Sequence, residues 1–399
     1  MPKKILFVIP DLGGNGASKS LINLLTIMDK KKYEIDLLVF NRRGLFAELV
    51  PEQVNIIEAP SPLKEYWYQI YIATKELLKS KSFNLVYKRV KWKAMEMVKF
   101  KPAVVSQKNY LGIKSLLPTL NGSYHAAISY LDFAPTYYVI DKVDADIKIG
   151  WNHNDYSKLS PNIEIDRMYL EKLDYLITVS EGCKAVLEEI YTDYKKKIRI
   201  IENINSPSVM YEMAKKENAF QDDYQGLRII TIGRLVEQKG IDLAILACKR
   251  LIEAGYDLQW HIIGEGPERA KLESLIEKLG LQKTFYLMGE VRNPYPFIDE
   301  CDLYVQPSRF EGKSIAVEEV KIFHKPMVVT NHPGFYEQVK NEVTGLIVSM
   351  DVEGVYFGIK RLIDNKKLRA RFSSELKREL HGNEDEVKHL YELLDGIPI

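Results

Sequence analysis

Two glutamates eight positions apart are the residues most suited to chemistry in this sequence. Glu311 precedes, and Glu319 lies within, a segment predicted to be helical. Eight helical residues rise by roughly 12 Å, about the span from a sugar, past a diphosphate, to a ribose. Between them lie Gly312, Lys313 and Ser314, whose backbone N–H groups would open the helix. Because a helix N-terminus attracts phosphate, this segment predicts a site for all three groups. A surface helix with exposed glutamates is the alternative.

A loop with two cations is the second candidate for binding phosphate. Arg234 and Lys239 lie between Gly233 and Gly240, directly after the predicted strand 228–232. Ligands bind at the carboxyl ends of parallel strands, and cations there neutralise charge that develops on a departing diphosphate. Arginine offers a planar fork and lysine a point charge, and both suit phosphate. We therefore assign both cations to a diphosphate. A solvated basic turn is the alternative.

Two glycine loops also follow predicted strands. Gly13, Gly14 and Gly16 open a helix in the N-terminal half and would approach the diphosphate from the opposite side. This loop is not GxGxxG, and it lacks the acidic residue that binds a nicotinamide ribose, which argues against a dehydrogenase. Gly264 and Gly266 either shape a pocket for the nucleotide base or only form a tight turn.

The N-terminal half offers few other candidates for chemistry. His153 follows the predicted strand 147–151 and would touch the sugar or the acceptor, unless its role is structural. The sole Asp-x-Asp sequence, Asp144 to Asp146, is expected in a solvated turn, so we expect no metal cofactor. No Asp or Glu in this half stands out as a nucleophile.

Strands, loops and helices alternate along the chain, which is typical of α/β proteins with parallel sheets. A chain of 399 residues exceeds the size of one core, so we expect two domains. The predicted domains are 1–205, 206–375 and a C-terminal helical segment, 376–399, that returns to the first domain. The predicted strands are 5–9, 35–40, 126–130, 147–151, 176–179 and 198–201, then 228–232, 258–263, 284–288, 303–306 and 327–330.

Composition narrows the class of protein. The net charge of +1 does not favour nucleic acid as a partner. Cys183, Cys248 and Cys301 form no CxxC pair, so neither a disulfide framework nor a zinc site is predicted, and a reducing cytoplasm fits. The apolar run 5–9 is too short for a signal peptide and is predicted to be a buried strand. No run of 18 apolar residues predicts a membrane-spanning helix.

Residues 64–114 are basic and rich in aromatic residues. They hold twelve Lys and Arg residues against three acidic residues. The interleaved aromatics are Tyr66, Trp67, Tyr68, Tyr71, Phe83, Tyr87, Trp92, Phe100 and Tyr110. Basic amphipathic segments with Trp and Tyr bind anionic lipid, so the segment predicts contact with the inner face of the cell membrane. A solvated helical face with aromatic core residues is the alternative.

The motifs GRLVEQKG, GEGPE, EGKSIAVEE and KPMVVTN together resemble glycosyltransferase family 4, and the resemblance spans residues 5–350. It implies a GT-B fold, in which two Rossmann-like domains face a central cleft, and a retaining reaction. It also implies that Arg234 and Lys239 grip the diphosphate, Glu311 meets the sugar hydroxyls and Glu319 binds the ribose. The backbone groups of Gly312 to Ile315 would help to hold phosphate and sugar. Gly14 and its neighbours would close on the donor from the first domain, and His153 would lie beside the sugar. Lys313 departs from the aromatic residue common in the family.

The expected activity is transfer of a hexosyl or N-acetylhexosaminyl group from a UDP-sugar to a glycan or lipid-linked acceptor in cell-surface polysaccharide biosynthesis. Two other classes remain open. A nucleotide-sugar epimerase would share the diphosphate site but need no acceptor. A non-catalytic nucleotide-sugar-binding protein would not need Glu311, Arg234 and Lys239 together.

Overall fold

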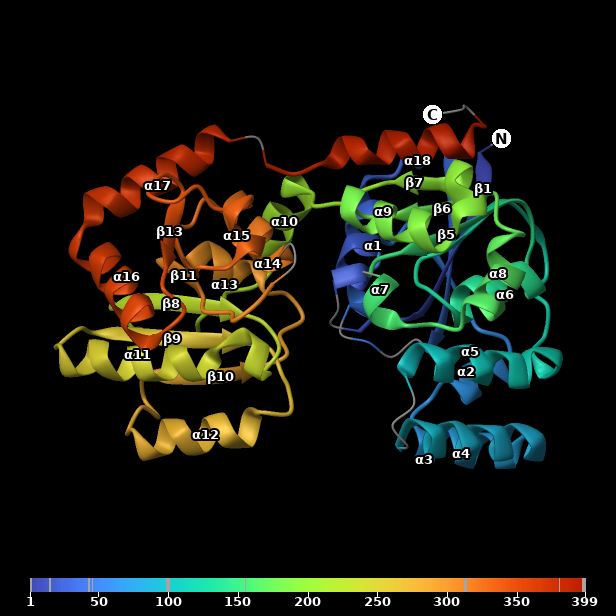
Figure 1. Cartoon of the computed structure of the whole chain (residues 1–399), viewed down its shortest axis with the longest axis horizontal. Coiled ribbons are helices and arrows are strands. Elements are labelled where there is room, and N and C mark those ends of the chain that lie inside the picture. Colours follow the sequence, from blue (N-terminus) through green and yellow to red (C-terminus); the bar gives the residue numbers. More distant parts are fainter. Residues whose placement is uncertain are drawn as a thin grey trace. The chain divides into compact units, whose positions relative to one another are not determined.

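The chain folds into two compact units, which a computed structural model describes for residues 2–13, 16–41, 44, 46–97, 101–154, 156–311, 314–379 and 381–396. Unit 1 comprises Met1–Ile204 and Asn383–Ile399, and unit 2 comprises Asn205–Gly382. Each unit is a parallel sheet flanked by helices (Figure 1). The α/β class with two parallel-sheet domains is therefore confirmed.

Unit 1 contains a seven-stranded sheet in the order β3-β2-β1-β4-β5-β6-β7. The strands are β1 (Lys3–Asp11), β2 (Tyr33–Asn41), β3 (Asn55–Glu58), β4 (Ser123–Ser129), β5 (Asp144–Asn152), β6 (Tyr175–Thr178) and β7 (Ile198–Ile200). Residues 5–9 of the central strand β1 are fully buried. Alternate residues of β1 belong to two different core clusters, one on each face. This explains the unbroken apolar run in the sequence, since both faces are covered.

The helices of unit 1 cover both faces of its sheet. They are α1 (Gly16–Ile27), α2 (Leu63–Tyr66), α3 (Ile70–Lys79), α4 (Phe83–Met97), α5 (Pro102–Ile113), α6 (Ala134–Lys142), α7 (Tyr156–Leu159), α8 (Ile163–Leu170), α9 (Glu181–Ile190) and α18 (Val387–Leu394). The core on one face takes apolar residues from α1 and α18, and the core on the other takes them from α2, α5 and α6. Helix α18 is tied to the start of the chain, because Lys3 Nζ lies 3.0 Å from Asp395 Oδ1.

Unit 2 contains a six-stranded sheet in the order β10-β9-β8-β11-β12-β13. The strands are β8 (Leu227–Ile232), β9 (Leu258–Ile263), β10 (Phe285–Gly289), β11 (Leu303–Gln306), β12 (Met327–Thr330) and β13 (Gly345–Val348). The helices are α10 (Pro207–Ala214), α11 (Ile241–Glu253), α12 (Arg269–Lys278), α13 (Tyr295–Glu300), α14 (Ile315–Ile322), α15 (Pro333–Tyr336), α16 (Val352–Asp364) and α17 (Lys366–Arg378). Apolar residues of α11, α16 and α17 pack on β8 and β9 in one core. Within the described residues, no helix is both long and apolar enough to cross a membrane.

The predicted strands all correspond to observed ones, but two observed strands were not predicted and one turn was predicted wrongly. The two strands that were not predicted, β3 and β13, have four residues each and are outermost in their sheets. The segment Asp144–Asp146 is not a turn, because it forms the first residues of β5. Both aspartate side chains are nevertheless exposed. Edge strands and strand starts contact solvent, so apolar patterning does not reveal them.

Candidate functional site

The strongest candidate site lies at the carboxyl ends of β8 and β11, which are neighbours in the sheet of unit 2. From β8 the chain continues outward to β9, whereas β11 continues to β12 on the other side. This is the switch point at which open α/β sheets bind ligands. The loops 233–240 and 307–314 both start here. The sheet topology therefore brings together the two loops that the sequence singled out.

Arg309 joins these two loops. Its guanidinium makes a bidentate ion pair with Asp242, at 2.8 and 2.6 Å, and donates to the Glu237 carbonyl at 2.7 Å. Its backbone N–H donates to the Gln238 carbonyl at 2.7 Å, and the Gln238 amide donates to the Phe310 carbonyl at 2.9 Å. Asp242 therefore neutralises the charge of Arg309, and this arginine positions the two loops.

The glycines of the site permit close backbone contact. Gly240 has φ of +63°, and a Cβ there would lie 2.0 Å from the Pro307 carbonyl oxygen. Gly264 has φ of +145°, and its Cβ would lie 2.1 Å from the Gly233 carbonyl oxygen. Gly266 would meet the Leu235 carbonyl oxygen at 2.3 Å. These positions require glycine for local geometry, which is a structural reason for their presence apart from any contact with a nucleotide base.

Glu311 and Lys239 form the centre of the site. Lys239 Nζ donates a short hydrogen bond to Glu311 Oε1, and the two side chains are 18% and 7% exposed. Ser308 Oγ donates to the same oxygen at 2.7 Å, and Gln306 Nε2 lies 3.5 Å from it. All these contacts converge on Oε1. Within the described residues, Oε2 has no donor, so this oxygen remains available to a hydroxyl of a ligand.

Arg234 lies on the same loop as Lys239 but is exposed. Across the described ranges, its side chain makes neither a hydrogen bond nor an ion pair. Lys239 and Glu311 neutralise each other, whereas Arg234 keeps an unbalanced positive charge. A strongly hydrated anion such as a diphosphate would therefore be attracted to this loop chiefly by Arg234.

The start of α14 completes the site on its third side. Ser314 caps the helix by accepting from Val317 N at 3.4 Å, and Ile315 is the first helical residue. Gln338 accepts from Ser314 N at 2.8 Å and donates to the Ser314 carbonyl at 2.9 Å. The predicted contacts Gly312 and Lys313 lie outside the described residues.

His332, which sequence reasoning missed, lies beside Glu311. Its Nδ1 accepts from Glu311 N at 3.3 Å and from Gly334 N at 3.1 Å. Because Nδ1 accepts, the proton of a neutral ring lies on Nε2. The feature of the sequence that could have identified His332 is its position, two residues after the predicted strand 327–330, at the carboxyl edge of the sheet.

Glu319 points into unit 2. It is only 1% exposed, and its Oε1 accepts from the Tyr295 hydroxyl of α13 at 3.1 Å. The ribose contact that the sequence predicts for Glu319 therefore stays a prediction, and it would require this buried carboxylate to exchange a partner.

The predicted residues of unit 1 lie at the carboxyl ends of its strands. Gly13 N donates to Asp11 Oδ1 at 2.8 Å, and Gly16 is the first residue of α1; Gly14 lies outside the described residues. His153 Nδ1 lies 2.9 Å from Asn203 Oδ1. Burial lowers the pKa of His153 to about 4, so its imidazole is neutral at pH 7. A neutral ring can orient a hydroxyl but adds no positive charge.

Asp132 is a second residue that sequence reasoning missed. It follows β4, next to β1 in the sheet, at the switch point of unit 1. Asn152 and Asn154 donate to its two oxygens, at 2.8 and 3.2 Å. Burial raises the pKa of Asp132 to about 7 despite these bonds. A carboxyl group that titrates near neutral pH suits acid–base chemistry, so Asp132 is the candidate for such chemistry in unit 1.

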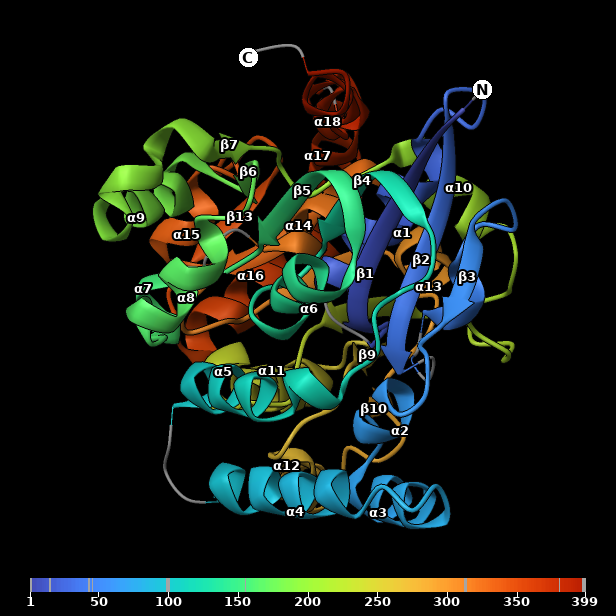
Figure 2. The ribbon, with the colours of Figure 1, turned by 90° about the vertical axis from the view of Figure 1, so that its right-hand side faces the viewer.

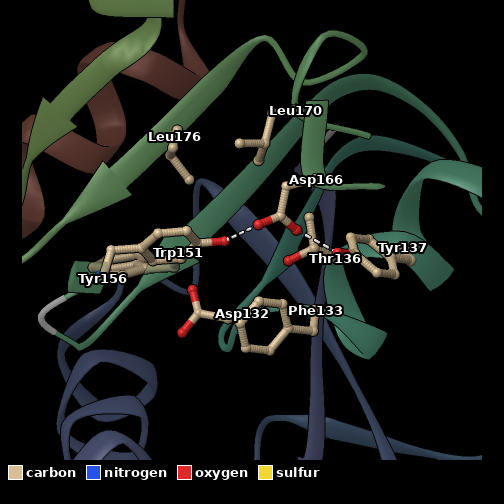
Figure 3. A pocket seen from close by; sticks show the side chains of 9 residues that line it. All are labelled: Asp132, Phe133, Thr136, Tyr137, Trp151, Tyr156, Asp166, Leu170 and Leu176. Atoms are coloured by element: carbon tan, nitrogen blue, oxygen red, sulfur yellow. Dashed lines mark hydrogen bonds between the residues drawn. The ribbon is translucent and has the colours of Figure 1, made fainter. Parts of the chain in front are cut away.

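A small cavity beside Asp132 is structural. Asp132 and Phe133 line it together with Asp166, whose carboxylate accepts from the hydroxyls of Tyr137 and Tyr156 (Figure 3). Its volume of about 10 Å³ is room for roughly one water molecule. A sugar cannot enter, so this tyrosine–aspartate network stabilises unit 1 and is not a substrate site.

Comparisons with known proteins agree with this geometry. Residues 212–379, which make up most of unit 2, match the family model described as glycosyl transferases group 1. The chain is 25% identical over 378 residues, 94% of both chains, to N-acetylgalactosamine-N,N'-diacetylbacillosaminyl-diphospho-undecaprenol 4-alpha-N-acetylgalactosaminyltransferase of Campylobacter jejuni. A shorter stretch of 185 residues, 45% of this chain and 36% of the relative, is 26% identical to poly(ribitol-phosphate) alpha-N-acetylglucosaminyltransferase of Staphylococcus aureus.

Solved structures share the two-domain architecture. Anabaena HepE in complex with UDP and glucose superposes with a TM-score of 0.64, at 14% identity over 98% of this chain and 99% of that one. S. aureus TarM in complex with UDP has a TM-score of 0.63, at 15% identity over 98% of this chain and 99% of that one. The GT-B fold expected from the sequence is confirmed.

Proposed function

We propose that the chain is a retaining glycosyltransferase that moves a sugar from a UDP-sugar to a lipid-linked glycan acceptor. The observation that carries the proposal is the arrangement at the switch point of unit 2. There, Lys239 donates to Oε1 of Glu311, and Oε2 of Glu311 is available to a ligand. Arg234 is exposed on the loop that carries Lys239.

Each of these side chains has a role that follows from its contacts. Glu311 is held by Lys239 and Ser308 through Oε1, so Oε2 is oriented to accept from a sugar hydroxyl. Lys239 has three N–H donors and uses one for Glu311, which leaves two for phosphate oxygens. Arg234 can then bind the diphosphate and stabilise the charge that develops as the glycosyl–phosphate bond breaks.

We further propose that the leaving diphosphate is stabilised without a metal ion, by Arg234, Lys239 and the N-terminus of α14. The neutral His153 and the carboxyl group of Asp132, both in unit 1, would contact the sugar or acceptor hydroxyls. Because Asp132 titrates near pH 7, the acceptor hydroxyl can transfer its proton either to this carboxylate or to the donor phosphate.

The choice of donor and acceptor rests on the similar proteins. HepE and TarM bind UDP, which supports a uridine nucleotide. The C. jejuni relative, similar over 94% of the chain, acts on a diphospho-undecaprenol, which supports a lipid-linked acceptor. The same name supports an N-acetylhexosamine as the transferred sugar, and the HepE complex with UDP-glucose supports a hexose.

A thermal-shift comparison of nucleotide sugars tests the donor site. Ligand at 100 times its Kd stabilises by about 2.7 kcal/mol, which raises the Tm of a unit of this size by about 5–11 °C. We expect a UDP-sugar to give this shift and Arg234→Ala to abolish most of it. Arg378→Ala, another exposed arginine of unit 2, is the matched control. Equal shifts for all nucleotides, or none with UDP-sugars, would contradict the donor assignment.

The reaction is tested by NMR of the product formed with a lipid-linked acceptor. Retention of the anomeric configuration and full activity in EDTA are expected, with loss of transfer in Glu311→Gln. An inverted product would refute the retaining mechanism. Conversion of the donor to an epimer without acceptor would identify an epimerase, and a Glu311→Gln variant with normal cellular function would identify a binding protein.

A further inference from the structure

The helices α3 and α4 form an outer layer of unit 1 (Figures 1 and 2). They pack against each other and against α2 and α5, which lie between them and the sheet. The turn at Ser80–Ser82 joins them, and Lys81 in this turn has φ of +56°. The pair therefore presents one side of each helix to solvent, whereas Leu77 and Leu85 enter the core.

The structure separates the aromatic residues of segment 64–114 into two groups. The rings of Tyr66, Trp67 and Trp92 lie with their centroids 5.4–6.0 Å apart, Tyr66 stacked on Trp92 and Trp67 tilted against both. The Arg89 guanidinium lies 4.2 Å from the Trp92 ring. These residues belong to the core of the unit or pack against it, as does Tyr110. These aromatic residues therefore serve the packing of unit 1, and the membrane contact expected of the segment stays a prediction for its other side chains.

The other group is exposed. It consists of Tyr71, Leu78, Phe83, Tyr87 and Val90, with exposed fractions of 77, 49, 65, 64 and 48%. These are five of the twelve large apolar side chains that are exposed within the described residues. On α3, Tyr71 and Leu78 are seven residues apart, and on α4 the spacing of the other three is i, i+4, i+7. Each set thus forms a stripe along one side of its helix.

Lysines alternate with these apolar residues. Lys75, Lys79, Lys81, Lys91 and Lys93 are exposed on the same two helices and their turn. Glu76 and Glu96 are the acidic residues of α3 and α4, and they pair with Lys79 and Lys93 at 2.8 and 3.0 Å. Within the described part of the chain, Lys75, Lys81 and Lys91 have no ion pair. The surface of α3 and α4 is therefore both apolar and unbalanced in charge.

We propose that this α3–α4 surface docks the enzyme on the surface of an anionic lipid bilayer. Exposed Tyr, Phe, Leu and Val side chains can enter the headgroup region, while unpaired lysines attract anionic headgroups. The uncompensated charge argues against a second copy of the chain as occupant, because two such surfaces would repel each other. The inference rests on the proposed function in one respect: docking would bring unit 1 to the membrane that holds a lipid-linked acceptor.

Sedimentation with vesicles tests the docking surface with the full-length protein and without donor or acceptor. Vesicles of phosphatidylcholine with phosphatidylglycerol should bind the protein at low salt and release it at high salt, and phosphatidylcholine alone should bind it weakly. Each lysine near an anionic surface strengthens binding about fivefold, so Lys75→Gln, Lys81→Gln and Lys91→Gln together should weaken it about 100-fold. Phe83→Ser with Tyr87→Ser should also weaken it.

Matched controls lie in unit 2. Phe357→Ser removes an apolar residue that is 56% exposed on α16, and Lys366→Gln with Lys367→Gln removes exposed charge on α17; both should bind vesicles as the unchanged protein does. Absence of binding at low salt, or equal loss in the controls, would overturn the proposal. Binding to an acidic protein but not to vesicles would do so as well.

The donor assay keeps this proposal separate from the proposed function. The α3–α4 variants should retain the thermal shift with a UDP-sugar and full transfer to a water-soluble acceptor, and lose transfer only to a membrane-embedded one. If vesicles bind but no donor does, the docking surface stands and the transferase assignment fails. If the donor binds but vesicles do not, the transferase assignment stands and the docking surface fails.

Discussion

The buried pair of Lys239 and Glu311 permits a test that separates stability from catalysis. Replacing Lys239 with Met would leave a carboxylate that is 7% exposed with only Ser308 and Gln306 as donors. Removing one partner of a buried ion pair costs about 3–5 kcal/mol, and the lower value applies here because Lys239 is 18% exposed. We therefore expect a loss of about 3 kcal/mol.

Glu311→Gln should cost less. The amide keeps the shape of the carboxylate, and the freed lysine can turn its ammonium toward water. We expect a loss of about 1–2 kcal/mol. The double variant, Lys239→Met with Glu311→Gln, leaves no buried charge unpaired. It should therefore be less destabilised than the sum of the single changes, by about 2 kcal/mol.

Scanning calorimetry measures these differences as changes in Tm. For a unit of this size, 1 kcal/mol corresponds to about 2–4 °C, so Lys239→Met should lower the transition of unit 2 by about 6–12 °C. Transfer activity should behave differently from stability, since both side chains are assigned to the donor. All three variants should lose about 100-fold or more in kcat/KM, including the double variant whose stability recovers.

Two results would refute this reasoning. An unchanged Tm in Lys239→Met would show that the pair is not buried and coupled as described. Recovery of activity in the double variant would show that the two charges serve only to stabilise unit 2 and do not contact the donor.

Three further predictions concern single residues. Gly240→Ala should lower the free energy of unfolding, measured in urea, by about 3 kcal/mol or more. Gly255 also has a positive φ but has open space around it, so Gly255→Ala should lower the free energy of unfolding by only about 1–2 kcal/mol. Equal losses in the two variants would contradict the backbone clash at Gly240. The pKa of Asp132 is higher in the folded than in the unfolded state, so the free energy of unfolding should fall by up to 1.36 kcal/mol per pH unit as pH rises from about 4 to about 7. Asp132→Asn should remove this slope in urea titrations and alter the pH–rate profile near 7. An unchanged slope in the variant would contradict the raised pKa. Tyr295→Phe removes a donor from the buried Glu319 and should lower Tm by an amount equivalent to about 1–3 kcal/mol, and an unchanged Tm would show that this hydrogen bond contributes nothing.

Much of the fold is encoded locally and could be predicted. Buried parallel strands such as β1 and β9 appear as short apolar runs, and glycines follow both of them. The loop after β8 carries both glycines and cations. Because the chain direction is the same in every parallel strand, loops that follow strands gather at one edge of the sheet. This explains why Arg234, Lys239 and Glu311 could be selected as site candidates without coordinates.

The tertiary structure alone decided how these side chains are partnered. Arg309 has the charge and position of a phosphate ligand, yet Asp242 neutralises it. His332 and Asp132 look ordinary in the sequence, and only the packing of neighbouring strands gives one its contact with Glu311 and the other its raised pKa.

The segment of α3 and α4 also shows which properties follow from the sequence and which from the packing. Its excess of lysines and aromatics is evident from composition, but Trp92 lies against the core and Tyr87 points to solvent. Local sequence determines which helix forms and how its residues repeat. Burial, partners and pKa depend on atoms brought close from distant parts of the chain, and those are determined only when the sheets and helices have packed.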